Sequence, residues 1–556
     1  MTDTLRGFTM EYPLTVTAIA RRAEALWAAR PVVSRTRGAP HRSTYGECLA
    51  RARRLAAALD RLGVQPGDRV ATLCWNHYRH FEAYIAVPLL GAVLHTLNLR
   101  LHPDELAYIA AHAEDRVVLV DPSLLPLLDG FRGRTAIRHV IVAGERGQAP
   151  DGMLDYESLL ADAPEIDLSA REPGERDAAS MCYTSGTTGR PKAVVYSHRA
   201  LVLHSMATAM AGSFAISEAD TVLAAVPMFH ANGWGLPYTA ALTGAGLVFP
   251  GEHPGATTLL DLCHSESVTF SAAVPTVWLG VLDALDAAPR GWKLPGLRIV
   301  IGGAAAPEGL VRGLEERHRI HPITSWGMTE IAPVGTVDGR PGALLELRVR
   351  NKAGLVPWDG VTMGELEVRG GYVASDYYRP DEETGCFPGD GWFRTGDIAS
   401  IDAEGRLEIR DRSKDLIKSG GEWISSVALE GALMSHPAVA EAAVVAVPHP
   451  RWLERPVAAV VLKSGSAATA EELHTWLAGR FPAWWLPDDV VFMPAIPRTS
   501  TGKFRKSELR DMLRAGIGRR RLCGHCGRYS RTPFRTRSSC WYWRWCGLQR
   551  WRPRPE

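Results

Sequence analysis

The sequence has few cysteines for its length and no pattern that would pair them. It contains nine in 556 residues, and five of these stand singly: Cys48, Cys74, Cys182, Cys263 and Cys386. Scattered thiols fit a reduced protein better than a disulfide framework. The first residues also lack a basic flank followed by an apolar core, so we expect no secretory signal and a cytoplasmic protein.

Long uncharged runs are also scarce. Residues 231–250 carry no charged side chain over about the length that crosses a bilayer. The run contains four glycines and two prolines and few large aliphatic residues. We therefore expect a buried strand and turn that line a pocket, and no membrane span.

The sequence also has no large excess of acidic or basic residues. The chain has 63 Lys and Arg against 61 Asp and Glu, but residues 519–556 hold eleven Arg and one acidic residue. The other residues therefore carry 52 basic and 60 acidic side chains. A mildly acidic body gives no reason to expect a nucleic-acid partner. The length predicts two or more domains.

Helical and strand-like segments alternate in the first half. Residues 45–62 have leucines at helical spacing, residues 102–114 resemble a capped helix, and apolar runs at 69–75 and 116–121 resemble strands. This alternation predicts an α/β fold with a doubly wound parallel sheet. Residues 144–179 are expected to cross the surface. Short strands follow residue 378, and a compact α+β domain is expected from about residue 413.

The strongest local motif is YTSGTTGRPK at residues 183–192. Gly186 and Gly189 permit backbone conformations that expose successive N–H groups, the hydroxyl groups can donate to oxyanions, and Lys192 adds a cation. This composition predicts a polyphosphate-binding loop, although it does not follow the G-x-x-x-x-G-K-[ST] pattern. A Ser/Thr/Gly surface loop is the alternative for this segment alone.

Further motifs follow in a fixed order. Residues 325–330, SWGMTE, combine an aromatic ring, a glycine, a hydroxyl and a carboxylate, a set that suits a base, a phosphate and hydrated Mg²⁺. Residues 391–397 form a predicted turn that presents Asp397 to ribose hydroxyls. The remaining motifs are DRSKD at 411–415, IKSGGEWI at 417–424 and PRTSTGK at 497–503.

Together these segments closely resemble the acyl-adenylate-forming superfamily of AMP-binding enzymes, over residues 12–515. Residues 227–238 and 419–456 are most similar to bacterial medium-chain acyl-CoA synthetases and 3-methylmercaptopropionyl-CoA ligases. The resemblance implies an N-terminal AMP-binding domain over residues 1–411, with two doubly wound α/β subdomains and a small β-barrel. It also implies a mobile α+β domain over 412–515.

The resemblance implies ATP-dependent formation of an acyl-AMP from a short- or medium-chain acid, followed by transfer of the acyl group to CoA. ATP, Mg²⁺ and CoA are the implied cofactor and co-substrates. The implied ATP-binding residues are Thr184, Ser185, Gly186, Thr187, Thr188, Gly189, Lys192, Gly303, Ala304, Ala305, Trp326, Gly327, Met328, Asp397 and Arg412. Thr329 and Glu330 would serve the α-phosphate, and Glu330 would hold the metal.

The resemblance assigns two lysines to successive steps. Lys503 would bridge the carboxylate and the α-phosphate while negative charge builds in the first half-reaction. Lys414 would be the hinge about which the C-terminal domain rotates to replace Lys503 with a CoA tunnel. Lys418, Gly420, Gly421 and Trp423 would line that tunnel. A solvated surface lysine is the alternative for Lys503.

His230, Trp234, Thr276 and Trp278 are the candidate acyl-pocket residues. His230 lies where the family places a residue at the pocket entrance, and a buried structural histidine is the alternative. Two tryptophans favour a modest pocket for short or medium chains, although aromatic walls also suit aryl acids.

Two segments depart from the family. The stretch after Glu330 reaches the next strands in few residues, so a missing connecting helix is expected to expose apolar surface and leave backbone groups unpaired. Residues 516–556 match nothing in the family, and their Arg/Trp/Cys-rich composition predicts an unstructured tail. A zinc knuckle formed by Cys523, Cys526, Cys540 and Cys546, or an Arg/Trp nucleic-acid patch, is the alternative.

Two other functions remain open from the sequence. The chain could load a separate carrier protein instead of CoA, or it could be a catalytically impaired nucleotide-binding remnant. A homodimer is also left open.

Overall fold

The structure is a computed structural model that describes residues 7–166, 172–184, 190–288, 291–380, 382, 384–420, 422–498 and 503–522, with side chains through residue 514. The chain divides into two compact units, Met1–Arg510 and Asp511–Glu556. The four cysteines of the alternative zinc knuckle lie outside the described residues.

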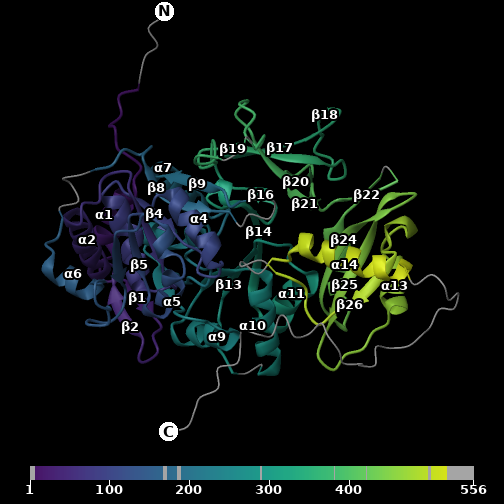
Figure 1. Ribbon diagram of the computed structural model, residues 1–556, viewed down its shortest axis with the longest axis horizontal. Coiled ribbons are helices and arrows are strands. Elements are labelled where there is room, and N and C mark those ends of the chain that lie inside the picture. Colours follow the sequence, from purple (N-terminus) through teal and green to yellow (C-terminus); the bar gives the residue numbers. More distant parts are fainter. Residues whose placement is uncertain are drawn as a thin grey trace, which may run out of the picture. The chain divides into compact units, whose positions relative to one another are not determined.

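The largest sheet has nine strands and is parallel through its centre. Its order is β16-β15-β14-β13-β12-β10-β11-β1-β2. Figure 1 labels β1, β2, β13, β14 and β16 of this sheet. The pairs of β1, β10, β12, β13 and β14 with their central neighbours are parallel, and β2, β15 and β16 add antiparallel edges. The strands are β1 (Pro31–Ser34), β2 (His41–Thr44), β10 (Thr221–Leu223), β11 (Gly246–Phe249), β12 (Phe270–Ala273), β13 (Arg298–Gly302), β14 (His321–Gly327), β15 (Val334–Val337) and β16 (Arg340–Pro341).

A second sheet has seven strands in the order β7-β6-β5-β3-β4-β8-β9. Only its β8–β9 pair is antiparallel, and this hairpin carries the predicted phosphate loop between its strands. The strands are β3 (Arg69–Leu73), β4 (Val93–Thr96), β5 (Val117–Val120), β6 (His139–Val142), β7 (Leu154–Asp155), β8 (Ala178–Tyr183) and β9 (Ala193–Ser197).

Helices alternate with these strands, as the sequence predicted. The helix at residues 45–61 begins at a capping box in which Thr44 and Glu47 bond each other's backbone N–H, and it buries Leu55 and Leu59. The predicted capped helix begins at Pro103 and ends at a left-handed Glu114. The helices are α1 (Val16–Trp27), α2 (Tyr45–Arg61), α3 (Tyr78–Leu89), α4 (Pro103–Ala113), α5 (Leu125–Asp129), α6 (Tyr156–Asp162), α7 (His198–Ala209), α8 (Leu236–Thr243), α9 (Ala256–Ser265), α10 (Pro275–Ala287) and α11 (Glu308–Arg312).

Two smaller sheets complete the described chain. The β-rich part expected as a small barrel is a five-stranded antiparallel sheet in the order β18-β17-β19-β20-β21. Its strands are β17 (Leu345–Asn351), β18 (Gly354–Leu355), β19 (Gly364–Gly370), β20 (Phe393–Ile401) and β21 (Leu407–Arg412). The α+β part contains β22 (Ile417–Ser419), β23 (Glu422–Ile424), β24 (Val439–His449), β25 (Leu453–Leu462), β26 (Asp489–Phe492), α12 (Ser426–Met434), α13 (Ala470–Ala478) and α14 (Lys506–Leu522).

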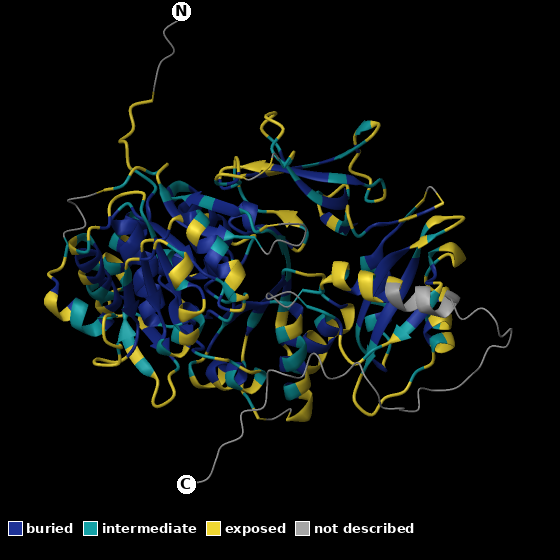
Figure 2. Cartoon of the chain, in the orientation of Figure 1, coloured by how far each residue is buried: buried dark blue, intermediate teal, exposed yellow. Residues whose placement is uncertain are grey.

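Buried side chains follow the strands of these sheets, whereas exposed residues gather on outer helix faces and turns (Figure 2). β5 and β11 are buried at every position, as strands covered on both faces are. The α/β class is thus confirmed. Helix α14 continues past residue 515, where the sequence analysis placed the start of the tail.

Four local expectations need correction. Residues 231–250 contain the buried helix α8 as well as a strand, and no described helix is long and apolar enough to cross a membrane. Residues 144–179 include β7 and α6. Asp397 lies within β20 and is not in a turn. The short connection after Glu330 forms β15, which is buried and paired with β14, so the strand pairing satisfies much of the backbone that was expected to be unpaired.

Candidate active site

A cavity of about 1230 Å³ brings most of the described candidate residues together. Its lining comes from segments far apart in the sequence, including the ends of β8, β13 and β14 and the start of α14. Strand ends are where side chains of an α/β fold can point into a shared space. The candidates that line it are Thr184, Lys192, His230, Trp234, Gly303, Ala304, Ala305, Gly327, Met328, Thr329, Glu330, Arg412, Lys414 and Lys503.

The β8–β9 hairpin holds the first cationic group of the cavity. The backbone N–H of Thr184 donates to the carbonyl of Lys192 at 2.8 Å, and the N–H of Lys192 donates to the Thr184 hydroxyl at 3.2 Å. The two contacts close the ends of the predicted phosphate loop. The residues between them, Ser185, Gly186, Thr187, Thr188 and Gly189, lie outside the described residues.

Glu330 lies in a short 3₁₀ turn directly after β14, and only 5% of its surface is exposed. Its Oε1 accepts a hydrogen bond of 2.6 Å from the Tyr377 hydroxyl. Burial raises the pKa of Glu330, although the hydrogen bond from Tyr377 acts in the opposite direction. A second tyrosine fixes the same turn, because the Tyr196 hydroxyl donates to the carbonyl of Thr329 at 2.6 Å.

Asp397 connects two other candidates. Its Oδ2 accepts the indole N–H of Trp326 at 2.8 Å, and its Oδ1 lies 2.6 Å from Nε of Arg412. The Trp326 ring packs so closely on Gly335 that a Cβ there would lie 2.7 Å from it. Trp326 and Asp397 do not line the described cavity, so their contacts with a base and a ribose stay predictions.

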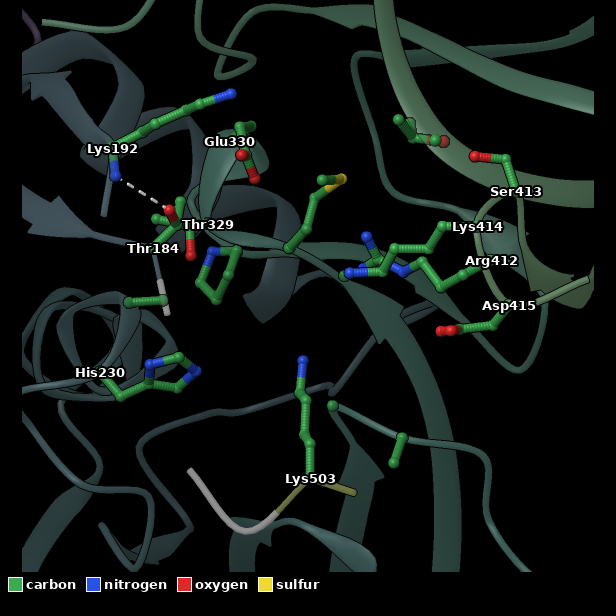
Figure 3. A pocket seen from close by; sticks show the side chains of 18 of the residues that line it. Thr184, Lys192, His230, Thr329, Glu330, Arg412, Ser413, Lys414, Asp415 and Lys503 are labelled. Atoms are coloured by element: carbon green, nitrogen blue, oxygen red, sulfur yellow. Dashed lines mark hydrogen bonds between the residues drawn. The ribbon is translucent and has the colours of Figure 1, made fainter. Parts of the chain in front are cut away.

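Lys503 points into the cavity between His230 and Arg412 (Figure 3). Its Cε lies next to Gly303, since a Cβ on that glycine would be 3.8 Å away. Burial and the positive charge of Arg412 lower the pKa of Lys503 to about 8, while Asp397 and Glu330 act in the opposite direction. A positive charge in this position favours anions in the same space.

The other end of the cavity is apolar. Trp234 is 7% exposed, and its ring lies over the end of β13, where a Cβ on Gly302 would be 3.0 Å from it. Trp234 belongs to the 3₁₀ segment Ala231–Gly235, in which all five residues have φ values between 35° and 70°. Left-handed backbone at non-glycine residues is costly and often marks a functional site. Burial lowers the pKa of His230 to about 3, and Lys503 adds to this effect, so the imidazole is neutral at pH 7.

Thr276 and Trp278 are not walls of this cavity. Both lie on α10, where Thr276 is exposed and Trp278 is 2% exposed in a separate core cluster. The indole N–H of Trp278 donates to the carbonyl of Val300 at 2.9 Å. Both residues were expected as pocket walls, but the orientation of α10 turns Trp278 toward β13.

The described candidates for the CoA tunnel, Lys418, Gly420 and Trp423, lie on the β22–β23 hairpin and do not line the described cavity. Lys418 is exposed, while Gly420 has a φ of 61° and would place a Cβ 2.8 Å from Trp452. Trp423 is half-buried on β23. Gly421 lies outside the described residues. The tunnel and the hinge at Lys414 stay predictions.

Sequence reasoning missed Tyr377 and Arg100. Besides its bond to Glu330, the Tyr377 ring lies 5.1 Å from Nζ of Lys192, so it contacts both the proposed metal-holding carboxylate and the lysine of the predicted phosphate loop. Arg100 is close enough to His230 to lower its pKa. Neither residue belongs to a motif, and the sequence around Tyr377 offers no signal beyond a pair of tyrosines.

Comparison with known proteins assigns this arrangement to a class. The family model described as AMP-binding enzyme matches residues 20–378, and the model of the AMP-binding enzyme C-terminal domain matches residues 428–503. The chain belongs to the AMP-binding enzyme family.

Individual relatives span nearly the whole chain. A long-chain-fatty-acid–CoA ligase of Thermus thermophilus is 49% identical over 92% of this chain and 97% of its own length. A 3-methylmercaptopropionyl-CoA ligase of Ruegeria lacuscaerulensis is 41% identical over 92% of this chain and 99% of its own. The crystal structure of the anthranilate CoA ligase AuaEII in complex with anthranoyl-AMP matches with a TM-score of 0.83 at 26% identity, and the match covers 92% of this chain and 99% of that one.

Proposed function

We propose that this chain is an ATP-dependent carboxylic acid–CoA ligase that forms an acyl-AMP and then transfers the acyl group to CoA. The observation that carries the proposal is the convergence of Thr184, Lys192, Glu330, Arg412 and Lys503 on one cavity with an apolar end. The cationic end suits a triphosphate, and the apolar end beside Trp234 suits an acyl chain. The relatives named as CoA ligases support CoA over a carrier protein.

ATP is required because a carboxylate is a poor electrophile. In the first half-reaction a carboxylate oxygen attacks the α-phosphorus, the bond to the β-phosphate oxygen breaks, and pyrophosphate leaves. Lys503 places its ammonium group where the carboxylate and the α-phosphate meet, and Thr184 and Lys192 hold the outgoing phosphates. In the second half-reaction the CoA sulfur attacks the acyl carbon, its proton is lost, and AMP leaves.

The residues around Glu330 fit Mg²⁺. Its carboxylate faces the cavity, and burial raises its pKa, so a cation nearby would offset the cost of keeping it charged. Oxygen ligands are those that Mg²⁺ prefers. We propose that Glu330 holds the ion, which when bound neutralises charge on the phosphates. Tyr377 keeps one carboxylate oxygen oriented by its hydrogen bond.

The first half-reaction should lose rate as the pH rises through about 8, because Lys503 acts as a cation and its pKa lies near that value in the free protein. The first-turnover rate at low substrate reports free-enzyme pKa values, so the fall should appear there at lower pH than at saturating substrate. The measurement is the rate of the first turnover of pyrophosphate release between pH 6.5 and 9.5 without CoA, because the thiol of CoA also ionises in this range. Lys503→Arg should remove the decline, whatever its absolute rate, and an unchanged profile would contradict this assignment.

We expect Trp234→Ala to shift acid preference toward longer chains. Trp234 lies over Gly302 and Gly303 at the apolar end, so its removal opens space that methylene groups can fill. Each buried CH₂ is worth about 0.8 kcal/mol, so adding two or three carbons should raise kcat/KM about ten-fold or more relative to the same comparison in wild type. Trp278→Phe, in the separate core cluster, is the matched control and should leave the preference unchanged. An equal loss of kcat/KM for acids of all chain lengths would contradict a role of Trp234 in substrate selection.

We also propose that a domain from about residue 412 to 515 rotates about Lys414 after acyl-AMP forms, and that Lys418, Gly420, Gly421 and Trp423 then border the path of the CoA arm. Short or medium acids are the proposed substrates, and the cytoplasm is the proposed location. A homodimer is an assembly that gel filtration with light scattering would test.

The decisive experiment is pyrophosphate release from ATP and Mg²⁺ across short, medium, branched, aryl and thioether acids, with and without CoA. We expect acid-dependent release that turns over fully only with CoA. Pyrophosphate release that does not depend on CoA would favour the carrier-loading function. No release from folded protein with any of the acids would favour the nucleotide-binding remnant.

A further inference from the structure

A second cavity, about 480 Å³ in volume, shares no lining residue with the first. Its size falls in the range of small-molecule sites. The proposed reaction uses none of its residues, and no sequence motif falls on it. Its charged lining is Arg51, Arg54, Arg79 and Arg146 against Glu145 and Glu157.

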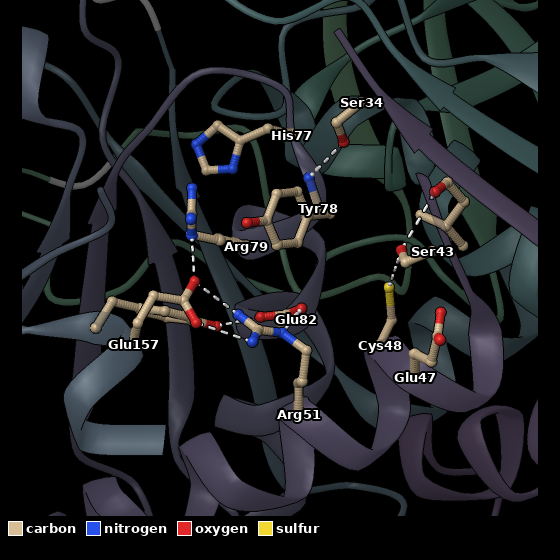
Figure 4. Close-up of polar contacts among 12 residues, drawn as sticks. Ser34, Ser43, Glu47, Cys48, Arg51, His77, Tyr78, Arg79, Glu82 and Glu157 are labelled. Atoms are coloured by element: carbon tan, nitrogen blue, oxygen red, sulfur yellow. Dashed lines mark hydrogen bonds and ion pairs between the residues drawn. The ribbon is translucent and has the colours of Figure 1, made fainter. Parts of the chain in front are cut away.

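Two of the arginines are held in place by ion pairs with glutamates of the surrounding structure. Arg51 donates from Nη1 and Nη2 to the two oxygens of Glu157 at 2.9 and 3.0 Å, and Arg79 donates from Nε to the same carboxylate at 2.8 Å (Figure 4). Arg51 also donates from Nε to the fully buried Glu82 at 2.7 Å. Folding has therefore already ordered both guanidinium groups, so these side chains lose less conformational entropy when a ligand binds.

The Nη2 atom of Arg79 pairs with an exposed glutamate. This atom donates to Oε1 of Glu145 at 2.9 Å, and Arg79 has a side chain 10% exposed whereas that of Glu145 is 75% exposed. The exposed carboxylate of Glu145 is solvated, which weakens its ion pair with Arg79. A bound anion can therefore replace this carboxylate on a guanidinium that is already buried and oriented.

Two further arginines line the cavity and make longer contacts with their partners. Arg54 is 46% exposed on its side chain and reaches Glu165 at 3.5 Å, and Arg146 is exposed with a bond of 3.4 Å from Nε to the Ser158 hydroxyl. These contacts are long for charged partners. The His41 and Tyr78 rings also line the cavity and stack with centroids 3.7 Å apart.

We propose that this cavity binds the phosphoryl group of a small phosphorylated compound, which displaces Glu145 from Arg79 and also contacts Arg54 and Arg146. Glu82 and Glu165 balance part of the charge of Arg51 and Arg54, so a positive balance arises only when Glu145 is displaced, and an anion can then take its place. A phosphate can accept from several guanidinium groups at once, which a monocarboxylate does less well. Guanidinium groups also pair with phosphate in a bidentate geometry. The volume leaves room for an organic body beside the phosphoryl group.

The test is calorimetric titration of the full chain at constant ionic strength, with the first cavity filled by a non-hydrolysable acyl-AMP analogue. The probes are inorganic phosphate, glycerol 3-phosphate and acetate. One site that binds both phosphates and not acetate is expected, and tighter binding of glycerol 3-phosphate than of phosphate would identify a phosphate ester as the source. Equal affinities would identify free phosphate. No heat from either phosphate, or acetate binding equally well, would overturn the proposal.

Three variants of exposed side chains decide where the probe binds. Glu145→Gln removes the competing carboxylate and should tighten phosphate binding about three-fold. Arg54→Gln and Arg146→Gln should each weaken it about ten-fold. Melting temperature and acid-dependent pyrophosphate release of all three should match wild type, since none touches the first cavity. Phosphate affinities that stay equal in all three variants would also overturn the proposal.

Discussion

Replacing Lys503 with alanine should lower the rate of acyl-AMP formation by about 10²–10³-fold, the effect of losing one preorganised charge from a transition state. Lys503 enters the cavity between His230 and Arg412, and its pKa of about 8 leaves it mostly charged at pH 7. Thioester formation from a supplied acyl-AMP should remain, because that step displaces AMP from the acyl carbon without building charge between the carboxylate and the α-phosphate. The two half-reactions are measured separately, as pyrophosphate release and as acyl-CoA formation from synthetic acyl-AMP.

Lys463→Ala is the matched control for Lys503→Ala. Lys463 is an exposed lysine at the end of β25, in the same α+β part of the chain, and should leave both half-reactions unchanged. Equal loss of both half-reactions in Lys503→Ala, with an unchanged melting temperature, would contradict the division of labour between Lys503 and the CoA-binding residues.

The sequence predicted the fold class because helices and strands leave strong local patterns, and the motifs that carry the family resemblance contain many of the residues that line the cavity. Leu55 and Leu59 mark one face of α2 by their spacing, and the Pro103 start of α4 follows from capping chemistry. The catalytic candidates lie in motifs whose residue types already suggest phosphate chemistry. That Thr184, Glu330 and Lys503 meet in one cavity was an implication of family resemblance, since nothing local relates positions so far apart.

The failures have equally local causes. Helix α8 was mistaken for a strand and turn because every residue from Leu236 to Ala241 is buried, which leaves no polar face to reveal a period of 3.6. Thr276 and Trp278 were assigned to the pocket without knowledge of the rotation of α10. Tyr377 was missed because a tyrosine that orients a carboxylate needs no motif. Contacts of this kind depend on tertiary packing between segments that the sequence does not connect.

Replacing Glu330 with glutamine should lower the rate of acyl-AMP formation by about 10²-fold. Most of this loss should appear as a higher Mg²⁺ concentration for half-maximal rate. The substitution keeps the shape of the side chain and an oxygen for the Tyr377 hydroxyl, so it removes the charge with little change in packing. The measurement is the Mg²⁺ dependence of pyrophosphate release. Glu404→Gln, an exposed glutamate in a turn, is the matched control and should behave as wild type.

The pH dependence separates a metal role for Glu330 from a structural one. Because burial raises the pKa of Glu330, protons compete with Mg²⁺ for the carboxylate, so the Mg²⁺ concentration for half-maximal rate should rise as the pH falls. Tyr377→Phe removes the hydrogen bond that opposes this pKa increase and should move the rise to higher pH, with a smaller rate loss than Glu330→Gln. Glu330→Gln should abolish the pH dependence of Mg²⁺ use altogether. A merely structural glutamate would instead lower the melting temperature on substitution and leave the Mg²⁺ dependence of the remaining activity as it is in wild type.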